Sequence, residues 1–346
     1  MENKAIFMHG TNDMIWKEIP VPEIGEEDVL IKVEAVGICG SDMHYYQHGK
    51  IGGFIVDGDF ILGHEAAGKV VEVGAKVKDL KVGDRVAMEP GVTCGKCEFC
   101  VTGKYNLCPD VEFFATPPYH GVFANYVKHP ASKCFKLPEH VSSIEGALVE
   151  PLNVGLHAAN QGNVKLGDTV VVFGTGCIGL CSLLASKAMG ASQIIVVDIL
   201  QNRLDKAKEL GATHVINAKN EDVVAKVMEL TNNLGAEVVI ETAGSEITLK
   251  QTVDVLKPAG TIVSVGMTPK DSIEFNFMKL QSKEGTIKSV FRYRNLYPTG
   301  INAIASGSIK IADIVSHKFD FEKTKEAFDY VAENPGEVVK AVIVMQ

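Results

Sequence analysis

The 346-residue sequence has no apolar run that approaches the roughly 18 residues of a membrane-spanning helix. It has no block of lysine and arginine, and its formal net charge of −9 further disfavours a nucleic-acid-binding surface. The N-terminal segment lacks the long apolar stretch of a signal peptide. We therefore expect a cytoplasmic protein that binds neither membranes nor nucleic acid.

The length and the cysteine pattern narrow the class of protein further. Single hydrophobic cores seldom exceed roughly 250–300 residues, so two domains are expected. Hydrophobic residues make up 46% of the chain and charged residues 22%, as in ordinary globular proteins. Four of the eight cysteines are closely clustered, which favours metal binding over a disulfide framework.

A short, glycine-bracketed and loop-rich segment from Cys39 to Glu65 concentrates side chains that bind metals. It opens with Cys39-Gly40-Ser41-Asp42-Met43-His44 and closes with Gly63-His64-Glu65. Cysteine and histidine are preferred zinc ligands, and a catalytic zinc keeps one position open beside three protein ligands. A buried cysteine beside an ordinary surface histidine is the alternative that this segment alone leaves open.

A group of four cysteines further along the chain has the spacing of a closed zinc site. Four thiolates placed this closely can surround one Zn²⁺ tetrahedrally, and such sites are structural. A redox pair from a single C-x-x-C, or chance, is the weaker alternative. The group consists of Cys94, Cys97, Cys100 and Cys108.

Glu150 is an acidic residue between apolar neighbours, followed by Pro151. Burying an unpaired carboxylate is costly, so Glu150 is a further candidate to face the metal. A carboxylate stabilised by a helix N-terminus is the alternative.

The chain changes character near Lys165. Before it, short β-branched runs end at glycines without a helical period between them, which predicts a barrel-like domain. After it, the apolar strand 168–173 leads into Gly174-Thr175-Gly176-Cys177-Ile178-Gly179, a helical pattern and a second strand that ends at Asp198. This order of strand, glycine turn, helix, strand and acid is the dinucleotide-binding fingerprint.

Each part of the fingerprint has a predicted role. Gly174 permits the tight turn, Gly176 admits the pyrophosphate, and Gly179 lets helix and strand pack closely, while Cys177 and Ile178 within the same turn are further candidates to bind the cofactor. Asp198 can accept hydrogen bonds from the ribose hydroxyls and repels a 2′-phosphate, so NAD is favoured over NADP. Arg203 leaves some NADP tolerance open, although it fits a helix surface.

Strands and helices continue to alternate up to about residue 289. Because ligands of doubly wound sheets lie beyond the carboxyl ends of the strands, four residues there are candidates to meet the cofactor, or else form ordinary turns. They are Thr242, Ala243, Val265 and Gly266. The residues after this unit are too few for a separate domain, so we expect them to complete the first one. The predicted fold is α/β, with a doubly wound parallel sheet at 153–289 and a β-rich domain from 1–152 and 290–346.

Taken together and in this order, the motifs resemble the zinc-dependent medium-chain dehydrogenase/reductase superfamily over essentially the whole length. Several segments look like its polyol branch, the sorbitol and xylitol dehydrogenases. The resemblance implies a Rossmann domain and a GroES-like catalytic domain. The segments are 39–46, 63–65, 115–118, 150–152 and 291–293.

The resemblance also implies roles for individual residues. Cys39 and His64 would bind the catalytic zinc, with Glu65 or Glu150 supplying a carboxylate directly or through water. The four clustered cysteines would hold a structural zinc. The resemblance suggests a homotetramer.

The implied reaction is the oxidation of a secondary hydroxyl of a polyol, with hydride transfer to NAD. Zinc would lower the pKa of the hydroxyl, and Ser41 would pass its proton towards His44. Asp42 is an alternative orienting group for a zinc-bound imidazole. Further predicted polyol contacts are Tyr45, Phe113, Thr116, Glu150, Arg292 and Tyr293.

Other activities remain open within the same chemistry. A secondary-alcohol, butanediol or threonine dehydrogenase would need few changes in the pocket. A non-catalytic nucleotide-binding protein is a remote alternative, because such a protein would be expected to lack the set of Cys39, His64 and Ser41.

Overall fold

The computed structural model describes residues 1–268 and 270–345, and their contacts divide the chain into two units. The first unit contains Met1–Glu150 and Tyr297–Gln346, and the second contains Pro151–Leu296. Residues 290–296 therefore belong to the second unit, whereas the sequence-based boundary lies between 289 and 290.

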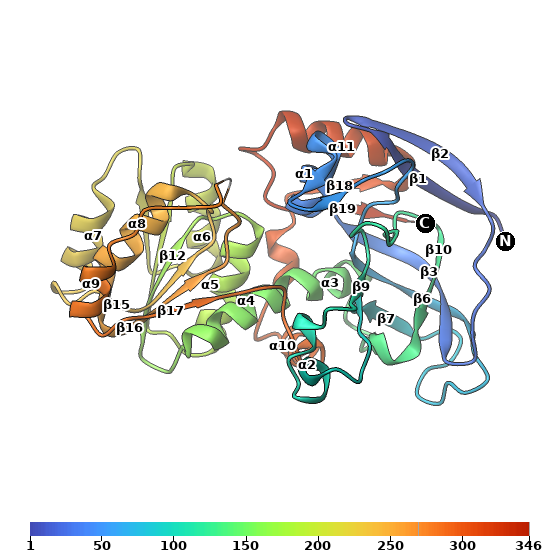
Figure 1. The fold of residues 1–346 in the computed structure, drawn as a ribbon, viewed down its shortest axis with the longest axis horizontal. Coiled ribbons are helices and arrows are strands. Elements are labelled where there is room, and N and C mark those ends of the chain that lie inside the picture. The colour runs from blue at the N-terminus through green and yellow to red at the C-terminus, as the bar shows by residue number, and fades with distance from the viewer. Residues whose placement is uncertain (269, 346) are drawn as a thin grey trace. The chain divides into compact units, whose positions relative to one another are not determined.

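The first unit is built on a mostly antiparallel seven-stranded sheet with the order β11-β7-β6-β3-β19-β18, and β10 also pairs with β3. The C-terminal strand β19 pairs antiparallel with β3, so a strand near the end of the chain joins a sheet whose first strand begins at Asp28 (Figure 1). Its strands are β3 (Asp28–Gly37), β6 (Glu65–Val73), β7 (Arg85–Met88), β10 (Tyr126–Pro130), β11 (Cys134–Lys136), β18 (His317–Asp320) and β19 (Ala341–Val344).

Smaller elements surround this sheet. A separate hairpin is formed by β1 (Asn3–Gly10) and β2 (Asp13–Ile19). The remaining short strands are β4 (Lys50–Ile51), β5 (Phe54–Ile55), β8 (Gly91–Val92) and β9 (Glu112–Phe113). The helices are α1 (Gly40–His48), α2 (Glu98–Val101), α3 (Ser143–Ala147), α10 (Tyr297–Ala305) and α11 (Thr324–Glu333), with 3₁₀ turns η1 (Tyr105–Leu107), η2 (Ala131–Lys133), η3 (Ile311–Ile314) and η4 (Phe321–Lys323).

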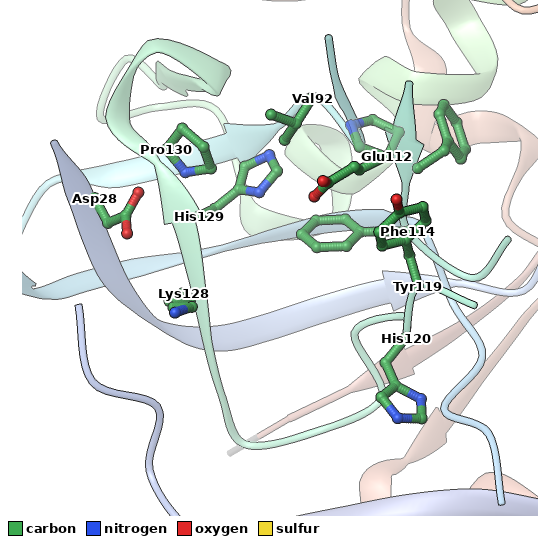
Figure 2. A pocket seen from close by; sticks show the side chains of 11 residues that line it. Asp28, Val92, Glu112, Phe114, Tyr119, His120, Lys128, His129 and Pro130 are labelled. Atoms are coloured by element: carbon green, nitrogen blue, oxygen red, sulfur yellow. The ribbon is translucent and has the colours of Figure 1, made fainter. Parts of the chain in front are cut away.

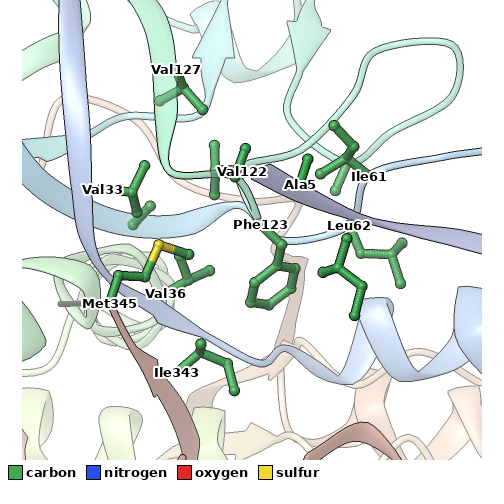
Figure 3. Close-up of a cluster of buried hydrophobic side chains, with 14 of the residues drawn as sticks. Ala5, Val33, Val36, Ile61, Leu62, Val122, Phe123, Val127, Ile343 and Met345 are labelled. Atoms are coloured by element: carbon green, nitrogen blue, oxygen red, sulfur yellow. The ribbon is translucent and has the colours of Figure 1, made fainter. Parts of the chain in front are cut away.

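The core of the first unit joins residues that are far apart in sequence. Phe123 is fully buried, and its ring packs edge-on against Phe328 of α11 at 5.6 Å between centroids. Leu62, Val36 and Ile343 belong to the same cluster (Figure 3). Leu62 immediately precedes Gly63-His64, so the core fixes the backbone that carries one candidate ligand.

The prediction that 39–65 is loop-rich, and that no helix interrupts the first strands, is wrong for α1. Contacts at the two ends of α1 explain why this segment is helical. The Asp42 carboxylate accepts a hydrogen bond from the Cys39 N–H at 2.9 Å, which caps the first turn. Gly49 adopts a left-handed conformation with φ 71° and donates its N–H to the Tyr45 carbonyl, which ends the helix.

The second unit contains a six-stranded sheet in which every pairing is parallel, with the order β14-β13-β12-β15-β16-β17. This confirms the predicted doubly wound sheet and, with the β-rich first unit, the predicted fold class. The strands are β12 (Thr169–Phe173), β13 (Gln193–Asp198), β14 (His214–Asn217), β15 (Ala236–Glu241), β16 (Leu256–Ser264) and β17 (Thr286–Ser289).

Helices connect these strands, as expected for parallel neighbours. They are α5 (Cys177–Ala188), α6 (Gln201–Leu210), α7 (Val223–Leu230), α8 (Glu246–Val255) and α9 (Phe277–Ser282) (Figure 1). Helix α4 (Val149–Gly162) begins in the first unit and continues into the second. In the part of the chain that is described, no helix has both the length and the apolar character needed to cross a membrane.

Candidate metal and cofactor sites

Three side chains of the first unit form a possible metal-binding group. The ligand atoms of Cys39, His64 and Glu65 all lie within 4.8 Å of one another, and His64 and Glu65 are buried. Cys39 precedes α1, and His64 and Glu65 lie where β6 begins. One thiol, one imidazole and one carboxylate form a donor set that suits a catalytic zinc.

Asp42 connects the two halves of this group. Its side chain is fully buried, and its Oδ1 accepts a hydrogen bond from Gly63 N at 3.0 Å while its Oδ2 caps Cys39. The same Oδ1 lies 3.6 Å from His64 Nδ1. Burial lowers the pKa of His64, but the negative charges of Asp42 and Cys39 outweigh this effect and the pKa is raised well above its usual value.

Glu65 also forms a buried ion pair that the sequence did not suggest. Lys340, just before β19, donates to both Glu65 oxygens at 2.7 and 2.8 Å and to the Ile38 carbonyl at 3.0 Å. Both side chains are at most 2% exposed. The partner was missed because it lies 275 residues away in sequence and is brought close only by the pairing of β19 with β3.

The other predicted residues of the first unit have varied environments. Helix α1 carries Ser41, His44 and Tyr45. Tyr45 is buried, whereas His44 is exposed. Partial desolvation and the neighbouring His48 lower the pKa of His44. Glu150 is buried in the first turn of α4, outside the group of three ligands. That placement matches the helix-terminus alternative raised for Glu150.

The cysteine lobe between β8 and β9 forms the second group. The ligand atoms of Cys94, Cys97, Cys100 and Cys108 lie within 4.8 Å of one another. The Sγ atom of Cys100 is 3.4 Å from that of Cys97 and 4.0 Å from that of Cys94. A zinc–sulfur distance of about 2.3 Å implies sulfurs about 3.8 Å apart in a tetrahedron, so the four thiols fit one Zn²⁺.

The thiols of the lobe differ in acidity. Hydrogen bonds from the Lys96 and Cys97 N–H groups lower the pKa of Cys94 to about 7. For Cys97, desolvation and the neighbouring thiols outweigh a backbone hydrogen bond and raise the pKa to about 12. Thiols this close cannot all ionise without a cation, which is the situation that a bound metal resolves.

The glycine turn of the second unit meets the steric demands of its fingerprint. Gly174 has φ 91°. A Cβ added at Gly179 would lie 1.9 Å from the Gly174 carbonyl oxygen, whereas one at Gly176 would meet no atom within 4 Å. Gly179 is therefore required for close packing, and the open space at Gly176 is where a pyrophosphate can approach the N-terminus of α5.

Asp198 ends β13 next to this turn. Its Oδ2 accepts hydrogen bonds from Thr175 N at 2.7 Å and Thr175 Oγ1 at 2.6 Å, and its Oδ1 accepts from the N–H groups of Ile199 and Leu200. Thr175 was not singled out from the sequence, because its position in the fingerprint tolerates any residue. Arg203 lies one turn into α6.

Thr242, Ala243, Val265 and Gly266 follow β15 and β16, at the same edge of the sheet as the glycine turn. Thr242 Oγ1 donates to the Phe173 carbonyl at 2.8 Å, which ties this edge to the end of β12. Arg292 and Tyr293 also belong to the second unit, so the three-residue metal group forms without them. The Arg292 guanidinium lies over the Phe291 ring at 4.9 Å.

A separate pocket of about 290 Å³ opens on the first unit. The rings of Phe114 and His129 pack at a tilt of 34° in its wall, with 4.5 Å between their centroids, close to Glu112 (Figure 2). Phe113 also lines it and lies 5.8 Å from the His64 ring. The pocket contains none of the proposed metal ligands.

Comparison with known proteins identifies the class. The family model of the alcohol dehydrogenase GroES-like domain matches residues 25–139, and that of the zinc-binding dehydrogenases matches 177–306. A zinc-type alcohol dehydrogenase-like protein of Escherichia coli is 48% identical over 99% of this chain and 98% of its own length. The crystal structure of an E. coli oxidoreductase of unknown specificity has a TM-score of 0.97 at 44% identity, covering 100% of both chains.

The chain belongs to the zinc-dependent medium-chain dehydrogenase/reductase superfamily. It is a zinc- and NAD-dependent oxidoreductase, as predicted. Sorbitol dehydrogenase of Rattus norvegicus is 46% identical over 95% of this chain and 92% of the rat protein, which places the chain in the polyol branch.

Proposed function

We propose that this enzyme oxidises a secondary hydroxyl of a polyol, of the sorbitol or xylitol type, to the corresponding 2-ketose with NAD as hydride acceptor. The observation that carries the proposal is the close group of Cys39, which is partly buried, with the buried His64 and Glu65, in a chain of the polyol branch. One thiolate and one carboxylate balance the charge of a divalent ion, and a fourth position is left for the substrate oxygen.

In this proposal Cys39, His64 and Glu65 bind the catalytic zinc directly, and Glu150 acts through a water molecule. The zinc supplies Lewis-acid polarisation of the substrate hydroxyl when it is bound. Ser41 accepts the hydroxyl proton and passes it towards His44 on the same helix. Desolvation and the neighbouring His48 lower the pKa of His44, so its imidazole is neutral near pH 7 and would release to solvent any proton that it takes up.

Specificity for a polyol needs several hydrogen-bond partners for its hydroxyl groups. We assign this role to Tyr45, Glu150, Arg292 and Tyr293, with Phe113 and Thr116 as further contacts. These assignments rest on the resemblance of their segments to the polyol branch.

The second unit binds NAD in this proposal. Gly174, Gly176 and Gly179 form the pyrophosphate turn with Cys177 and Ile178, and Asp198 binds the ribose. We assign further contacts with the cofactor to Arg203, Thr242, Ala243, Val265 and Gly266. The four hydrogen bonds that hold the Asp198 carboxylate support it as a fixed anion that disfavours the 2′-phosphate of NADP.

The cysteine lobe would hold a structural zinc, and its four separate thiols favour a reducing compartment such as the cytoplasm. A homotetramer is the proposed assembly. Among the described residues β17 pairs only with β16, and all four β17 residues are exposed. An open strand edge of this kind is a natural place for a second copy to pair.

A substrate panel tests the activity. Sorbitol, xylitol, ribitol, butanediol and threonine are each offered with NAD, and NADH formation is followed by absorbance. We expect the highest kcat/KM with a polyol. Preference for butanediol or threonine would reject the polyol assignment while leaving the zinc chemistry intact.

Variants test the site within the same assay. Cys39→Ala and His64→Ala should abolish turnover, while NADH binding, measured by fluorescence, stays unchanged. His214→Ala removes a histidine of the second unit as a matched control and should leave turnover intact. Normal activity in Cys39→Ala would reject the catalytic-zinc assignment.

A further inference from the structure

Glu241, the last residue of β15, is a buried carboxyl group that none of the roles above uses. It is fully buried. Its Oε1 accepts hydrogen bonds from Ala243 N at 2.9 Å, Gly244 N at 2.9 Å and Thr248 Oγ1 at 2.8 Å. One oxygen atom therefore fixes the turn between β15 and α8.

The main chain of Glu241 holds a second loop. Its carbonyl oxygen accepts hydrogen bonds from Val265 N at 2.9 Å and Gly266 N at 3.0 Å, where the chain leaves β16. The two loops also touch each other closely. A Cβ added at Gly266 would lie 2.3 Å from Gly244 N, and one at Gly244 would lie 2.2 Å from the Met267 carbonyl oxygen. Glu241 thus joins two loops whose backbones are in direct contact.

The second oxygen of the Glu241 carboxyl group, Oε2, lies beside the contact between these two loops. Oε2 is buried without a hydrogen-bond partner among the described residues, and a Cβ at Gly266 would lie 2.9 Å from it. A bare carboxylate oxygen in this place is costly. Desolvation raises the pKa of Glu241 against the hydrogen bonds that lower it, so the group is driven towards its neutral form.

The position of these loops defines which part of the cofactor they serve. In a doubly wound sheet of this strand order, the dinucleotide lies across the carboxyl ends of the strands, one nucleotide on each side of the first strand. Asp198, at the end of β13, marks the adenosine side. β15 and β16 lie on the other side of β12, so their loops border the nicotinamide side.

We infer that Glu241 is a positioning residue that holds the loops 242–245 and 265–267 in the shape required by the nicotinamide half of NAD. Without its Oε1, three donors lose their shared acceptor and the first loop is released from β15. The adenosine half depends on the glycine turn and Asp198, which Glu241 does not hold. This inference deepens the proposed cofactor site and rests on it.

The test compares two ligands that differ by the nicotinamide group. Dissociation constants for NADH and for ADP-ribose are measured by calorimetry on the full-length enzyme. Glu241→Leu should weaken NADH binding about tenfold, as expected when buried donors lose their acceptor, while ADP-ribose binding changes less than about twofold. Glu241→Gln keeps an oxygen acceptor and mimics the neutral acid, so it should retain both affinities.

Glu237→Leu is the matched control, because Glu237 lies on the same strand near its opposite end and pairs with Lys257. It should change neither affinity. Equal weakening of NADH and ADP-ribose by Glu241→Leu, or no change in either, would overturn the inference. If Glu241→Leu does not fold, Thr248→Val removes one of the three donors and should weaken NADH more than ADP-ribose; equal effects there would also overturn it. Failure of the wild-type enzyme to bind ADP-ribose would instead reject the proposed cofactor site.

Discussion

At the scale of single residues, a buried neighbour, Asp42, connects the candidate metal ligands Cys39 and His64. Asp42 accepts hydrogen bonds from the backbone on either side of the group and lies close to the His64 imidazole. A carboxylate in this place fixes the orientation of the ring and raises its basicity as a ligand.

Asp42→Asn should therefore lower zinc affinity about 10- to 100-fold, the usual effect of losing such an outer partner. The amide keeps one oxygen acceptor but loses the negative charge beside His64. Zinc affinity is measured by competition with a chromophoric chelator. Asp222→Asn, which changes the exposed N-cap of α7, is the control and should have no effect on affinity. Unchanged zinc affinity in Asp42→Asn would show that the carboxylate only caps α1.

His129 leads to a prediction about pH. Burial is the main reason that its pKa falls to about 4, and its Nε2 is 2.7 Å from the Glu89 carbonyl oxygen. The unfolded chain protonates this histidine near its usual pKa of about 6.5. Between pH 6.5 and 4 the unfolded state therefore binds more protons, so stability is fully present above this window and falls as pH decreases through it.

The expected loss from His129 is about 2 kcal/mol at pH 5 relative to pH 7. His129→Gln keeps a donor for the Glu89 carbonyl and should lose less stability than the wild type over this range. Urea unfolding at both pH values measures the difference. His48→Gln changes an exposed histidine and should behave as the wild type. Identical pH dependence in His129→Gln would mean that the imidazole protonates without cost in the folded state.

At the scale of elements, the last strand of the chain stabilises the first metal group. Lys340 lies directly before β19, and its ammonium group is fully paired with Glu65 and the Ile38 carbonyl. Breaking a buried pair by removing one partner typically costs 3–5 kcal/mol, because a charge is left without compensation. A bound zinc would supply that compensation to Glu65 if Glu65 is a direct ligand.

Lys340→Met should therefore cost about 3–5 kcal/mol in zinc-free protein and clearly less in zinc-loaded protein. Urea unfolding midpoints with chelator and with excess zinc give the comparison. Lys325→Met removes an exposed pair with Asp329 within α11 and should cost under about 1 kcal/mol in both conditions. An equal loss with and without zinc would indicate that Glu65 does not bind the metal directly.

At the scale of the whole molecule, both groups of candidate metal ligands lie within the first unit. Each is complete without residues of the second unit, which carries the nucleotide fingerprint. Metal occupancy and cofactor binding can therefore be measured independently in the full-length chain.

Elemental analysis of the purified enzyme should find about two zinc ions per chain. Cys39→Ala and Cys97→Ser should each retain about one, and the double variant should retain none. Cys97→Ser should also make the lobe between β8 and β9 sensitive to proteases, since its few core contacts would no longer be supported by a metal. A single zinc in the wild-type chain would reject the assignment of two sites.

Much of this organisation follows from local patterns in the sequence. The apolar strand before Gly174, the glycine spacing and Asp198 predict the parallel sheet, because each depends on residues close together in the chain. The cysteine lobe is predicted for the same reason. Helix α1 was missed because its start depends on the capping contact of Asp42 rather than on a hydrophobic period.

The sequence by itself therefore determined the class of fold, the nucleotide fingerprint and the two groups of candidate metal ligands, with Glu65 and Glu150 as alternatives for the carboxylate of the first group. Only the tertiary structure placed the Glu65 carboxylate within 4.8 Å of Cys39 and His64, paired it with the buried Lys340, and buried Glu241 beneath two loops of the second unit. Sequence patterns indicate contacts between residues that are close together in the chain, within a turn, a helix or a strand. Contacts between Glu65 and Lys340 depend on how distant strands pair, and burial then fixes which charges must meet.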